Sequence, residues 1–365
     1  MKVLVTGADG FLGWHTRVRL TATTPHDVVG VSRRNWAELP RLAKDADLIV
    51  HCAGVNRGDD SAVQEGNLAV AVDLAEAVRG SGARPRVVYA NSVQADLDNI
   101  YGKAKRDAGA ELSAAVADVG GQFSDVRLPN LFGEHGRPRY NSFVATFVDA
   151  IVGGTEPPVG DRELQLLHAQ SAAARLISDD LAPSVVRPAG TTANVRGVYL
   201  RLRLMHAGYA STGEIPDLSA PLDLALFNTL RARMFPQAYP MAITAHQDSR
   251  GRLVELVHSN GGGQSFLSTT RPGVTRGEHF HLEKVERFVV VSGTARIALR
   301  RMLTDEIIVF EVDGSQPMIV DMPTLWAHNI TNIGSDTLVT AFWSSSLFDP
   351  SAPDTFPEVV EPSAK

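Results

Sequence analysis

The sequence predicts two domains of different fold class: an α/β domain with a doubly wound parallel sheet over residues 1–238, then an all-β barrel domain over residues 239–365. A chain of 365 residues is too long for one ordinary hydrophobic core. Residues 2–6 form an apolar run that leads into a glycine-rich turn and a helical pattern, as doubly wound folds begin. Beyond the prolines of residues 235–240, alternating apolar residues with short turns replace the helical pattern, which indicates a β domain.

The glycine-rich turn predicts a dinucleotide site. Glycines at positions 7, 10 and 13 let the backbone turn tightly and approach a diphosphate at the N-terminus of the following helix. We expect the cofactor to contact the turn, the first helical residues and a later glycine-containing turn. These residues are Gly7, Gly10, Phe11, Leu12, Gly13 and Ala53.

The second strand, residues 27–34, indicates which dinucleotide binds. An enzyme that uses NAD usually has Asp or Glu at the end of this strand, where the carboxylate binds the ribose 2′-hydroxyl. Here Ser32, Arg33 and Arg34 occupy that end. Arginine pairs well with a phosphate, so the sequence favours NADPH over NADH. The alternative is that both arginines belong to a solvated loop.

Ser92, Tyr101 and Lys105 are the candidate catalytic residues. Ser92 ends the predicted strand 86–92, at the sheet edge where ligands bind in such folds. Tyr101 and Lys105 are four residues apart and share a helix face. A nearby ammonium should lower the tyrosine pKa from its usual value near 10, and Tyr101 could then protonate a ketone oxygen that Ser92 polarises. The alternative is an exposed tyrosine beside salt-bridged lysines.

Together with the glycine turn, these three residues resemble the extended short-chain dehydrogenase/reductase family, whose first domain has a Rossmann-type fold. The resemblance implies that Ser92, Tyr101 and Lys105 are catalytic and that Lys105 also contacts the cofactor. It further implies that the segment after residue 127 lines a sugar-nucleotide pocket. Its substrate-side candidates are Asn130, Tyr140 and Asn141.

Four residues of the second domain predict a metal site. His279 and His281 alternate, so on a strand both side chains leave the same face. Glu286 follows close behind, and His328 lies downstream. Three imidazoles and one carboxylate suit zinc, iron, manganese or nickel. Three surface histidines are the alternative, but ligand type and spacing agree on a metal.

These ligands, with Gly273, Gly293, Pro323 and Asn332, match the two motifs of the cupin family. The sequence therefore resembles a cupin, a small β-barrel with its site in the mouth. Leu325 stands where the second motif usually has glycine, a departure that affects a turn and not a ligand. The resemblance makes a divalent metal, most of all zinc, the expected ion.

A reductase of the extended type followed by a metal cupin resembles a family of bifunctional enzymes of capsular-polysaccharide biosynthesis. In that family the cupin epimerises C3 of a UDP-linked 4-keto-6-deoxy-2-acetamido sugar, and the reductase then reduces C4 with NADPH to give a 6-deoxy-talosamine-type sugar. Epimerisation must come first, because a C–H group is acidic beside a ketone and not beside an alcohol. Two alternatives stay open: a 4-ketoreductase with a non-catalytic, dimerising cupin, and an NADPH-binding sensor or scaffold.

The base for epimerisation is unassigned, and Glu255 and His258 are candidates by motif neighbourhood. The family's lysine beside the metal-ligand glutamate is replaced by Arg287, which cannot act as a base at neutral pH. If that lysine matters in the family, epimerase activity is weakened or lost here.

Composition excludes several partners. A formal charge of −6 argues against nucleic acid, and no apolar run approaches the ~20 residues needed to span a membrane. The single cysteine, Cys52, and the absence of a signal peptide predict a cytoplasmic protein. The expected partners are a nucleotide-sugar substrate and a second copy of the chain, because cupins commonly dimerise.

Overall fold

The computed structural model describes residues 1–361, which divide into two compact units. Unit 1 consists of Met1–Phe132, Gly136–Phe143 and Asp161–Val195. Unit 2 consists of Gly133–His135, Val144–Gly160 and the chain from Arg196 onward. Unit 2 thus includes helices that precede the predicted boundary at residues 238 and 239, and that boundary stays a prediction. Within residues 1–361, no helix combines the length and apolar character needed to cross a membrane.

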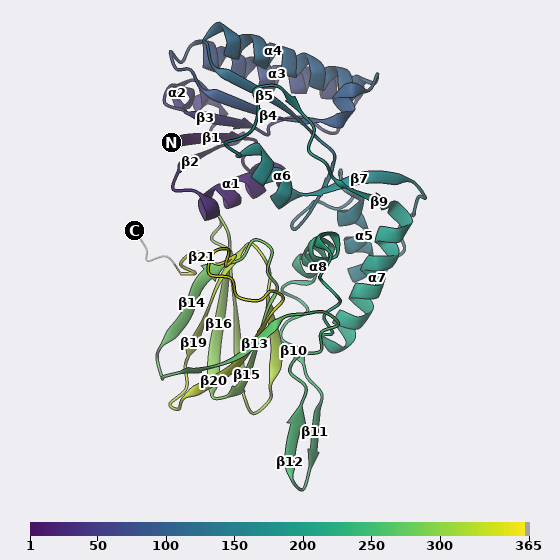
Figure 1. Cartoon of the computed structure of the whole chain (residues 1–365), viewed down its shortest axis with the longest axis vertical. Helices are drawn as coiled ribbons and strands as arrows, with labels where there is room; N and C mark the ends of the chain where they lie inside the picture. Colours follow the sequence, from purple (N-terminus) through teal and green to yellow (C-terminus); the bar gives the residue numbers. More distant parts are fainter. Residues whose placement is uncertain (362–365) are drawn as a thin grey trace. The chain divides into compact units, whose positions relative to one another are not determined.

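Unit 1 is a doubly wound α/β structure (Figure 1). Its six-stranded sheet has the order β2-β1-β3-β4-β5-β8, with all neighbouring strands parallel. The strand order reverses between β1 and β3, which is the point where such sheets bind ligands. A second sheet has the order β6-β7-β9. The elements are β1 (Lys2–Thr6), α1 (Phe11–Thr23), β2 (Asp27–Val31), η1 (Trp36–Glu38), α2 (Leu39–Ala43), β3 (Leu48–His51), α3 (Asp60–Arg79), β4 (Arg86–Ser92), η2 (Val93–Asp96), α4 (Ile100–Asp118), β5 (Gln122–Leu128), β6 (Asn130–Phe132), β7 (Glu163–His168), α6 (Ala169–Leu176), β8 (Val185–Val186) and β9 (Thr191–Asn194).

Alternate residues of β1 explain why helices cover both faces of this sheet. Leu4 packs in a core with Leu74 of α3 and Leu112 of α4. Val3 and Val5 point the other way, into a core that also holds Leu20 of α1. Side chains of a strand alternate between its two faces, so a continuous apolar run requires a cover on each face.

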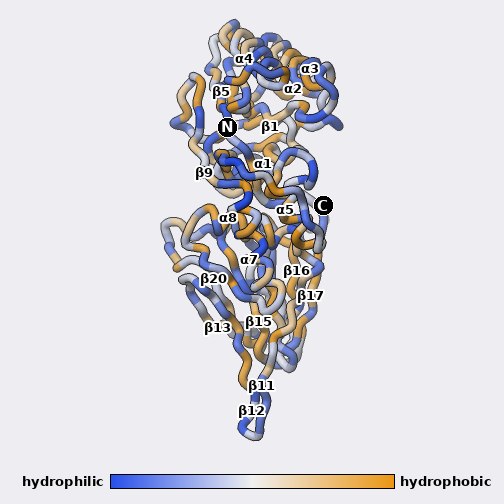
Figure 2. The backbone as a smooth tube through the Cα atoms, turned by 90° about the vertical axis from the view of Figure 1, so that its right-hand side faces the viewer, coloured by the Kyte–Doolittle hydropathy of each residue, from blue (hydrophilic) through white to orange (hydrophobic). Residues whose placement is uncertain are grey.

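Unit 2 is a barrel of two five-stranded sheets accompanied by helices (Figure 1). The sheet orders are β10-β18-β15-β20-β13 and β17-β16-β19-β14-β21, and a separate hairpin pairs β11 with β12. Figure 2 shows that the tip of this hairpin is hydrophilic. The elements are α5 (Phe143–Val152), α7 (Val195–Thr212), α8 (Pro221–Met234), β10 (Met241–Ala242), β11 (Ala245–Asp248), β12 (Gly251–Val254), β13 (Gln264–Thr270), β14 (Thr275–Phe280), β15 (Glu286–Ser292), β16 (Thr294–Arg301), β17 (Ile307–Asp313), β18 (Met318–Met322), β19 (Trp326–Asn332), β20 (Leu338–Ser344) and β21 (Phe356–Pro357).

Buried polar groups attach α7 and α8 to the barrel. Tyr209 of α7 donates a hydrogen bond of 2.6 Å to the Asp321 carboxylate on β18. Arg231 of α8 is 1% exposed and donates to the Met322 carbonyl at 3.1 Å. Buried polar groups must find partners, so these bonds fix the helices against specific strands.

Candidate functional sites

The glycine turn after β1 is built for close approach. Gly7 has φ of 66°, and a Cβ there would lie 2.7 Å from the Ala53 backbone nitrogen. A Cβ at Gly13 would lie 2.2 Å from the Gly7 carbonyl oxygen. Gly10 caps α1 without a side-chain hydrogen bond, and the first turn of the helix holds no acidic residue. The backbone N–H groups of this turn therefore suit a diphosphate.

The end of β2 offers two cations. Asn35 orders the loop, because its Oδ1 accepts a 2.8 Å hydrogen bond from the Ser32 N–H. Arg33 and Arg34 follow, both exposed, and neither forms an ion pair within residues 1–361. No acidic side chain occupies positions 32–35. The end of β2 thus has two exposed arginines and lacks the carboxylate that usually binds a ribose 2′-hydroxyl.

Ser92 and Tyr101 lie at the ends of two neighbouring elements of unit 1. Ser92 is the last residue of β4, and its Oγ accepts a hydrogen bond of 3.2 Å from the Gln94 N–H. Tyr101 lies in the first turn of α4 and donates a hydrogen bond of 3.1 Å to Asn56 Oδ1. The sequence correctly predicted both elements, strand and helix.

Lys105, four residues after Tyr101 on α4, is buried, with 4% of its surface exposed. Its Nζ donates a hydrogen bond of 3.3 Å to the Ala90 carbonyl and lies 4.3 Å from the centroid of the Tyr89 ring. Burial lowers the pKa of Lys105 to about 8. The ammonium is therefore within reach of deprotonation under mildly alkaline conditions.

The expected lowering of the Tyr101 pKa is wrong for this structure. Burial, with a smaller contribution from Tyr140, raises the pKa of Tyr101 to about 12. The Lys105 ammonium bonds to Ala90 and the Tyr89 ring, and its attraction does not overcome the loss of hydration. Tyr101 therefore stays a protonated phenol at neutral pH.

The three predicted substrate residues lie in two places. Asn130 begins β6 and donates a hydrogen bond of 3.2 Å to the Gln165 carbonyl. It lines a pocket of about 470 Å³, together with Val93 beside Ser92. Tyr140 and Asn141 instead lie in the segment 136–143.

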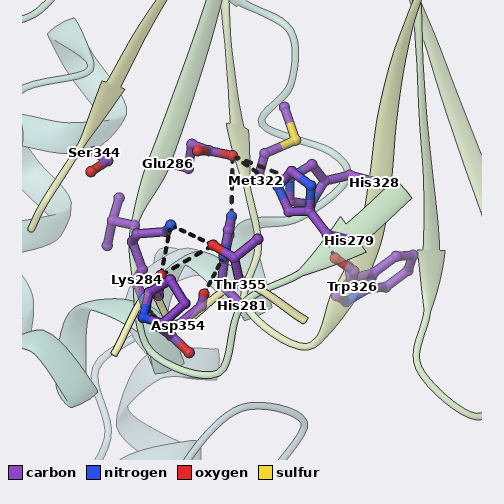
Figure 3. Close-up of polar contacts among 12 residues, drawn as sticks. His279, His281, Lys284, Glu286, Met322, Trp326, His328, Ser344, Asp354 and Thr355 are labelled. Carbon is purple, nitrogen blue, oxygen red and sulfur yellow. Dashed lines mark hydrogen bonds and ion pairs between the residues drawn. The ribbon is translucent and has the colours of Figure 1, made fainter. Parts of the chain in front are cut away.

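The four predicted metal ligands converge in unit 2 (Figure 3). One potential ligand atom from each residue lies within 4.8 Å of the others. Glu286 Oε2 lies 3.1 Å from His281 Nε2, 3.2 Å from His328 Nε2 and 3.8 Å from His279 Nε2. Only His279 is partly exposed among the four. Three imidazoles and a carboxylate at these separations could hold a metal ion.

Neighbouring carbonyl groups orient two of the imidazoles. His281 Nδ1 donates to the Asp354 carbonyl at 2.6 Å, and His328 Nδ1 to the Trp326 carbonyl at 3.2 Å. A carbonyl only accepts, so the proton is on Nδ1 and the Nε2 lone pair faces the cluster. Burial lowers the pKa of His328 to about 4, which keeps this imidazole neutral. Burial opposes ionisation of Glu286, but the three imidazoles around it hold its pKa well below its usual value.

Leu325 adopts the backbone conformation of the residue it replaces. Its φ is 66°, in the left-handed region that favours glycine, and its side chain is fully buried. Its N–H donates to the His281 carbonyl at 2.9 Å. The turn is thus retained without glycine at a cost of about 1–2 kcal/mol, against which burial of the leucine acts.

Arg287 points away from the cluster, because neighbouring residues on β15 face opposite sides. Its guanidinium donates to the Asp321 carboxylate at 2.7 and 2.9 Å and to the Gly213 carbonyl at 2.7 Å. Arg287 and Asp321 are 1% and 0% exposed. Arg287 therefore joins the barrel to the end of α7 and takes no part in the cluster.

A pocket of about 320 Å³ lies beside the cluster. Ser344, which lines it, pairs across the sheet with Glu286. Lys284 also lines it and donates to Thr355 Oγ1 at 2.9 Å (Figure 3). The candidate bases Glu255 and His258 are exposed, and His258 Nδ1 lies 3.7 Å from Glu255 Oε2.

Sequence reasoning missed Lys284 and Asp354. The Asp354 carboxylate accepts hydrogen bonds from the N–H groups of Leu282, Glu283 and Lys284, at 2.7–3.0 Å. Lys284 lies inside the first cupin motif, so the sequence alone could have identified it as a candidate. Asp354 lies about seventy residues downstream of Lys284, so no local sequence pattern indicates that the two are in contact.

Comparisons with known proteins match both halves. Residues 3–175 match the NAD dependent epimerase/dehydratase family, and residues 246–356 match the polysaccharide biosynthesis C-terminal domain. The chain is 32% identical over 375 residues to the UDP-2-acetamido-2,6-beta-L-arabino-hexul-4-ose reductase of Pseudomonas aeruginosa, covering 98% of each protein.

Solved structures agree with this match. The capsular polysaccharide assembling protein CapF from Staphylococcus aureus is similar with a TM-score of 0.63 at 31% identity, over 99% of this chain and 100% of that one. The UDP-glucose 4-epimerase of Thermotoga maritima has a TM-score of 0.50 at 16% identity, over 57% of this chain and 83% of that one. This second likeness concerns the fold alone.

Proposed function

The chain belongs to the CapF-like family of polysaccharide-biosynthesis proteins, and we propose that it is a bifunctional nucleotide-sugar enzyme. Its substrate is a UDP-linked 4-keto-6-deoxy-2-acetamido-hexose, which the barrel epimerises at C3 and unit 1 then reduces at C4. The product is a UDP-N-acetyl-6-deoxy-talosamine-type sugar. The observation that supports this most is the presence of two separate sites, one with Tyr101 as a protonated acid and one with a converged set of metal ligands.

In the reduction, Tyr101 donates its phenolic proton to the C4 oxygen. A pKa raised to about 12 keeps that proton in place at neutral pH. Ser92 donates a hydrogen bond to the same oxygen, and the Lys105 ammonium stabilises the phenolate that Tyr101 leaves behind. Bound NADPH supplies the hydride.

NADPH is the proposed cofactor because of the end of β2. The diphosphate fits the glycine turn at the start of α1. Arg33 and Arg34 offer exposed cations to a 2′-phosphate, with no carboxylate at positions 32–35 to repel it.

In the epimerisation, His279, His281, Glu286 and His328 would hold one divalent cation, with zinc the proposed ion. When bound, that cation supplies Lewis acidity at the ketone oxygen, which makes the adjacent C3–H more acidic. The pocket beside the cluster would hold the sugar, with Ser344 and Lys284 in its wall. Arg287 faces Asp321, so its substitution for the family's lysine leaves the cluster side of β15 unchanged.

A second copy of the chain is the proposed macromolecular partner. β13 lies at a sheet edge, and its Phe266 and Leu267 are 44% and 66% exposed. An apolar edge strand favours pairing with another strand. Light scattering should give twice the chain mass, and Leu267→Lys should shift the protein toward the monomer.

Deuterium exchange tests the proposal. The 4-keto substrate is incubated in deuterium oxide without NADPH, beside an enzyme-free control, and deuterium at C3 is measured by NMR. We expect exchange with the wild type and none with His279→Ala. NADPH is then added, and its oxidation is followed.

The alternative functions give other results. Oxidation of NADPH without enzyme-dependent exchange at C3 would leave a 4-ketoreductase with a non-catalytic barrel. NADPH binding without oxidation, across a panel of keto-sugar nucleotides, would favour a sensor or scaffold.

A further inference from the structure

We propose that Arg57 and Arg137 bind the diphosphate of the nucleotide-sugar substrate. Both arginines lie near the aromatic ring of Tyr140. The proposal rests on the proposed function and adds a phosphate-binding pair to unit 1. Arg57 lies between β3 and α3, and Arg137 lies in the segment 136–143.

Both guanidinium groups lie against the ring of Tyr140, and neither is paired with a carboxylate among the described residues. The Arg57 and Arg137 Cζ atoms lie 5.8 and 5.1 Å from the centroid of the Tyr140 ring. Both side chains are exposed, and within residues 1–361 neither forms an ion pair. Two like charges held near one ring repel each other, and a divalent anion between them would relieve that repulsion.

Arg57 is held in place but keeps donors available. Its Nη2 donates to the Tyr140 carbonyl, and its Nε lies 3.5 Å from Asn141 Oδ1. A guanidinium has five N–H donors in a planar fork that matches phosphate oxygens. The remaining N–H groups on Nη1 and Nη2 can therefore bind an anion while the other contacts fix the side chain.

The pair adjoins the proton donor of the reduction. Asn56, the residue before Arg57, accepts the hydrogen bond from the Tyr101 hydroxyl at 3.1 Å. Tyr140 also lies near enough to Tyr101 to influence its ionisation. In a pyranose, C1 carries the diphosphate and C4 the ketone, on opposite sides of one ring. A ketone at Tyr101 thus puts the diphosphate about one sugar ring away, in the neighbourhood of Arg57.

The cofactor's phosphates have other places in the sheet. The glycine turn follows β1, and Arg33 and Arg34 follow β2. Arg57 follows β3, on the other side of β1 from β2. Arg57 thus lies apart from the residues proposed for the cofactor's phosphates, which leaves the substrate's diphosphate as the anion that we propose for this pair.

Binding of UDP and UMP tests the inference without turnover. The wild type should bind UDP at least about tenfold more tightly than UMP, because a charge-assisted bond to the second phosphate adds that much. Arg57→Met and Arg137→Met should each weaken UDP binding about tenfold, weaken UMP binding less, and leave NADPH binding within about twofold. Arg57→Lys keeps a charge and should recover part of the loss. The matched control is Arg84→Met, an exposed arginine before β4. Calorimetry measures all the affinities.

Three outcomes would overturn the inference: unchanged UDP affinity in both methionine variants, an equal loss for UMP and UDP, or a loss of NADPH affinity in place of UDP affinity. Its failure is distinct from that of the proposed function. A wild type that binds UDP as expected but reduces no keto sugar would leave the diphosphate site standing and remove the reductase. Normal turnover with an unchanged KM for the sugar in Arg57→Met would leave the reductase standing and remove the diphosphate site.

Discussion

The histidine–glutamate cluster of unit 2 and the candidate reductase site of unit 1 are held together in different ways. In the cluster, the side chains contact one another, with Glu286 within 3.8 Å of each histidine Nε2. In the reductase site, Ser92, Tyr101 and Lys105 each bond to a different neighbour, and no hydrogen bond links the three to one another. The cluster is organised around one shared point, whereas the reductase residues are positioned separately by the ends of β4 and α4. We therefore expect damage at one site to leave the other intact.

Loss of the phenol should have the largest effect and tests this independence directly. Tyr101→Phe removes the proton donor and should slow NADPH oxidation by about 10²–10⁴-fold. Deuterium uptake at C3 should stay at the wild-type rate, because the cluster lies in the other unit. Parallel NMR and NADPH assays on one preparation make the measurement. An equal loss of both activities would break the comparison.

Arg287 tests whether the neighbour of a ligand is structural. Arg287→Met leaves Asp321 charged and buried without its partner, and unfolding of unit 2 should become easier by about 3–5 kcal/mol. The double variant Arg287→Met/Asp321→Leu removes both charges and should recover much of this loss. Calorimetric unfolding of the wild type and both variants provides the test. A double variant as unstable as the single one would contradict the buried-charge explanation.

The pH dependence of reduction should follow Lys105. Because burial lowers its pKa to about 8, the ammonium is present below that pH and is lost above it. Tyr101, with a pKa raised to about 12, stays protonated throughout this range. The reduction rate at saturating substrate should fall about tenfold per pH unit above pH 8, and Lys105→Arg should move that fall to higher pH.

Burial of Lys105 also affects stability, with a definite sign. The unfolded lysine, with a pKa of 10.5, binds more protons than the folded one between about pH 8 and that value. The contribution of this group to folding should therefore become more favourable as pH rises through that window. A Lys105→Met variant should lack this rise in an unfolding titration.

The cofactor arginines should show the smallest effect. Arg33→Ala and Arg34→Ala each remove an exposed cation, and the preference for NADPH over NADH should fall about five- to tenfold. The ratio of kcat/KM for the two cofactors measures it, with Arg84→Ala as the control. An unchanged ratio in both variants would indicate that these arginines belong to a solvated loop and do not bind the 2′-phosphate.

Local pattern alone was sufficient for much of the fold. The strands at 2–6 and 86–92 and the helix that carries Tyr101 and Lys105 occur where the sequence predicts them. Three of the four predicted metal ligands, His279, His281 and Glu286, converge because alternation and a short return direct them locally, whereas His328 is brought to them by the pairing of β14 with β19. As the sequence predicts, leucine in place of glycine at position 325 affects a turn and no candidate metal ligand.

Other features depended on which distant segments pack together. The sequence by itself determined the residue types and spacings of both sites, because these rest on periodicities of two and 3.6 residues. Only the tertiary structure decided that Asp354 caps the loop at Lys284, that Arg287 pairs with Asp321, and that Arg57 meets Tyr140. It also reversed the expected shift in the Tyr101 pKa. The reason is that burial and long-range contact depend on the whole packed chain, and no local pattern records how much water a side chain loses on folding.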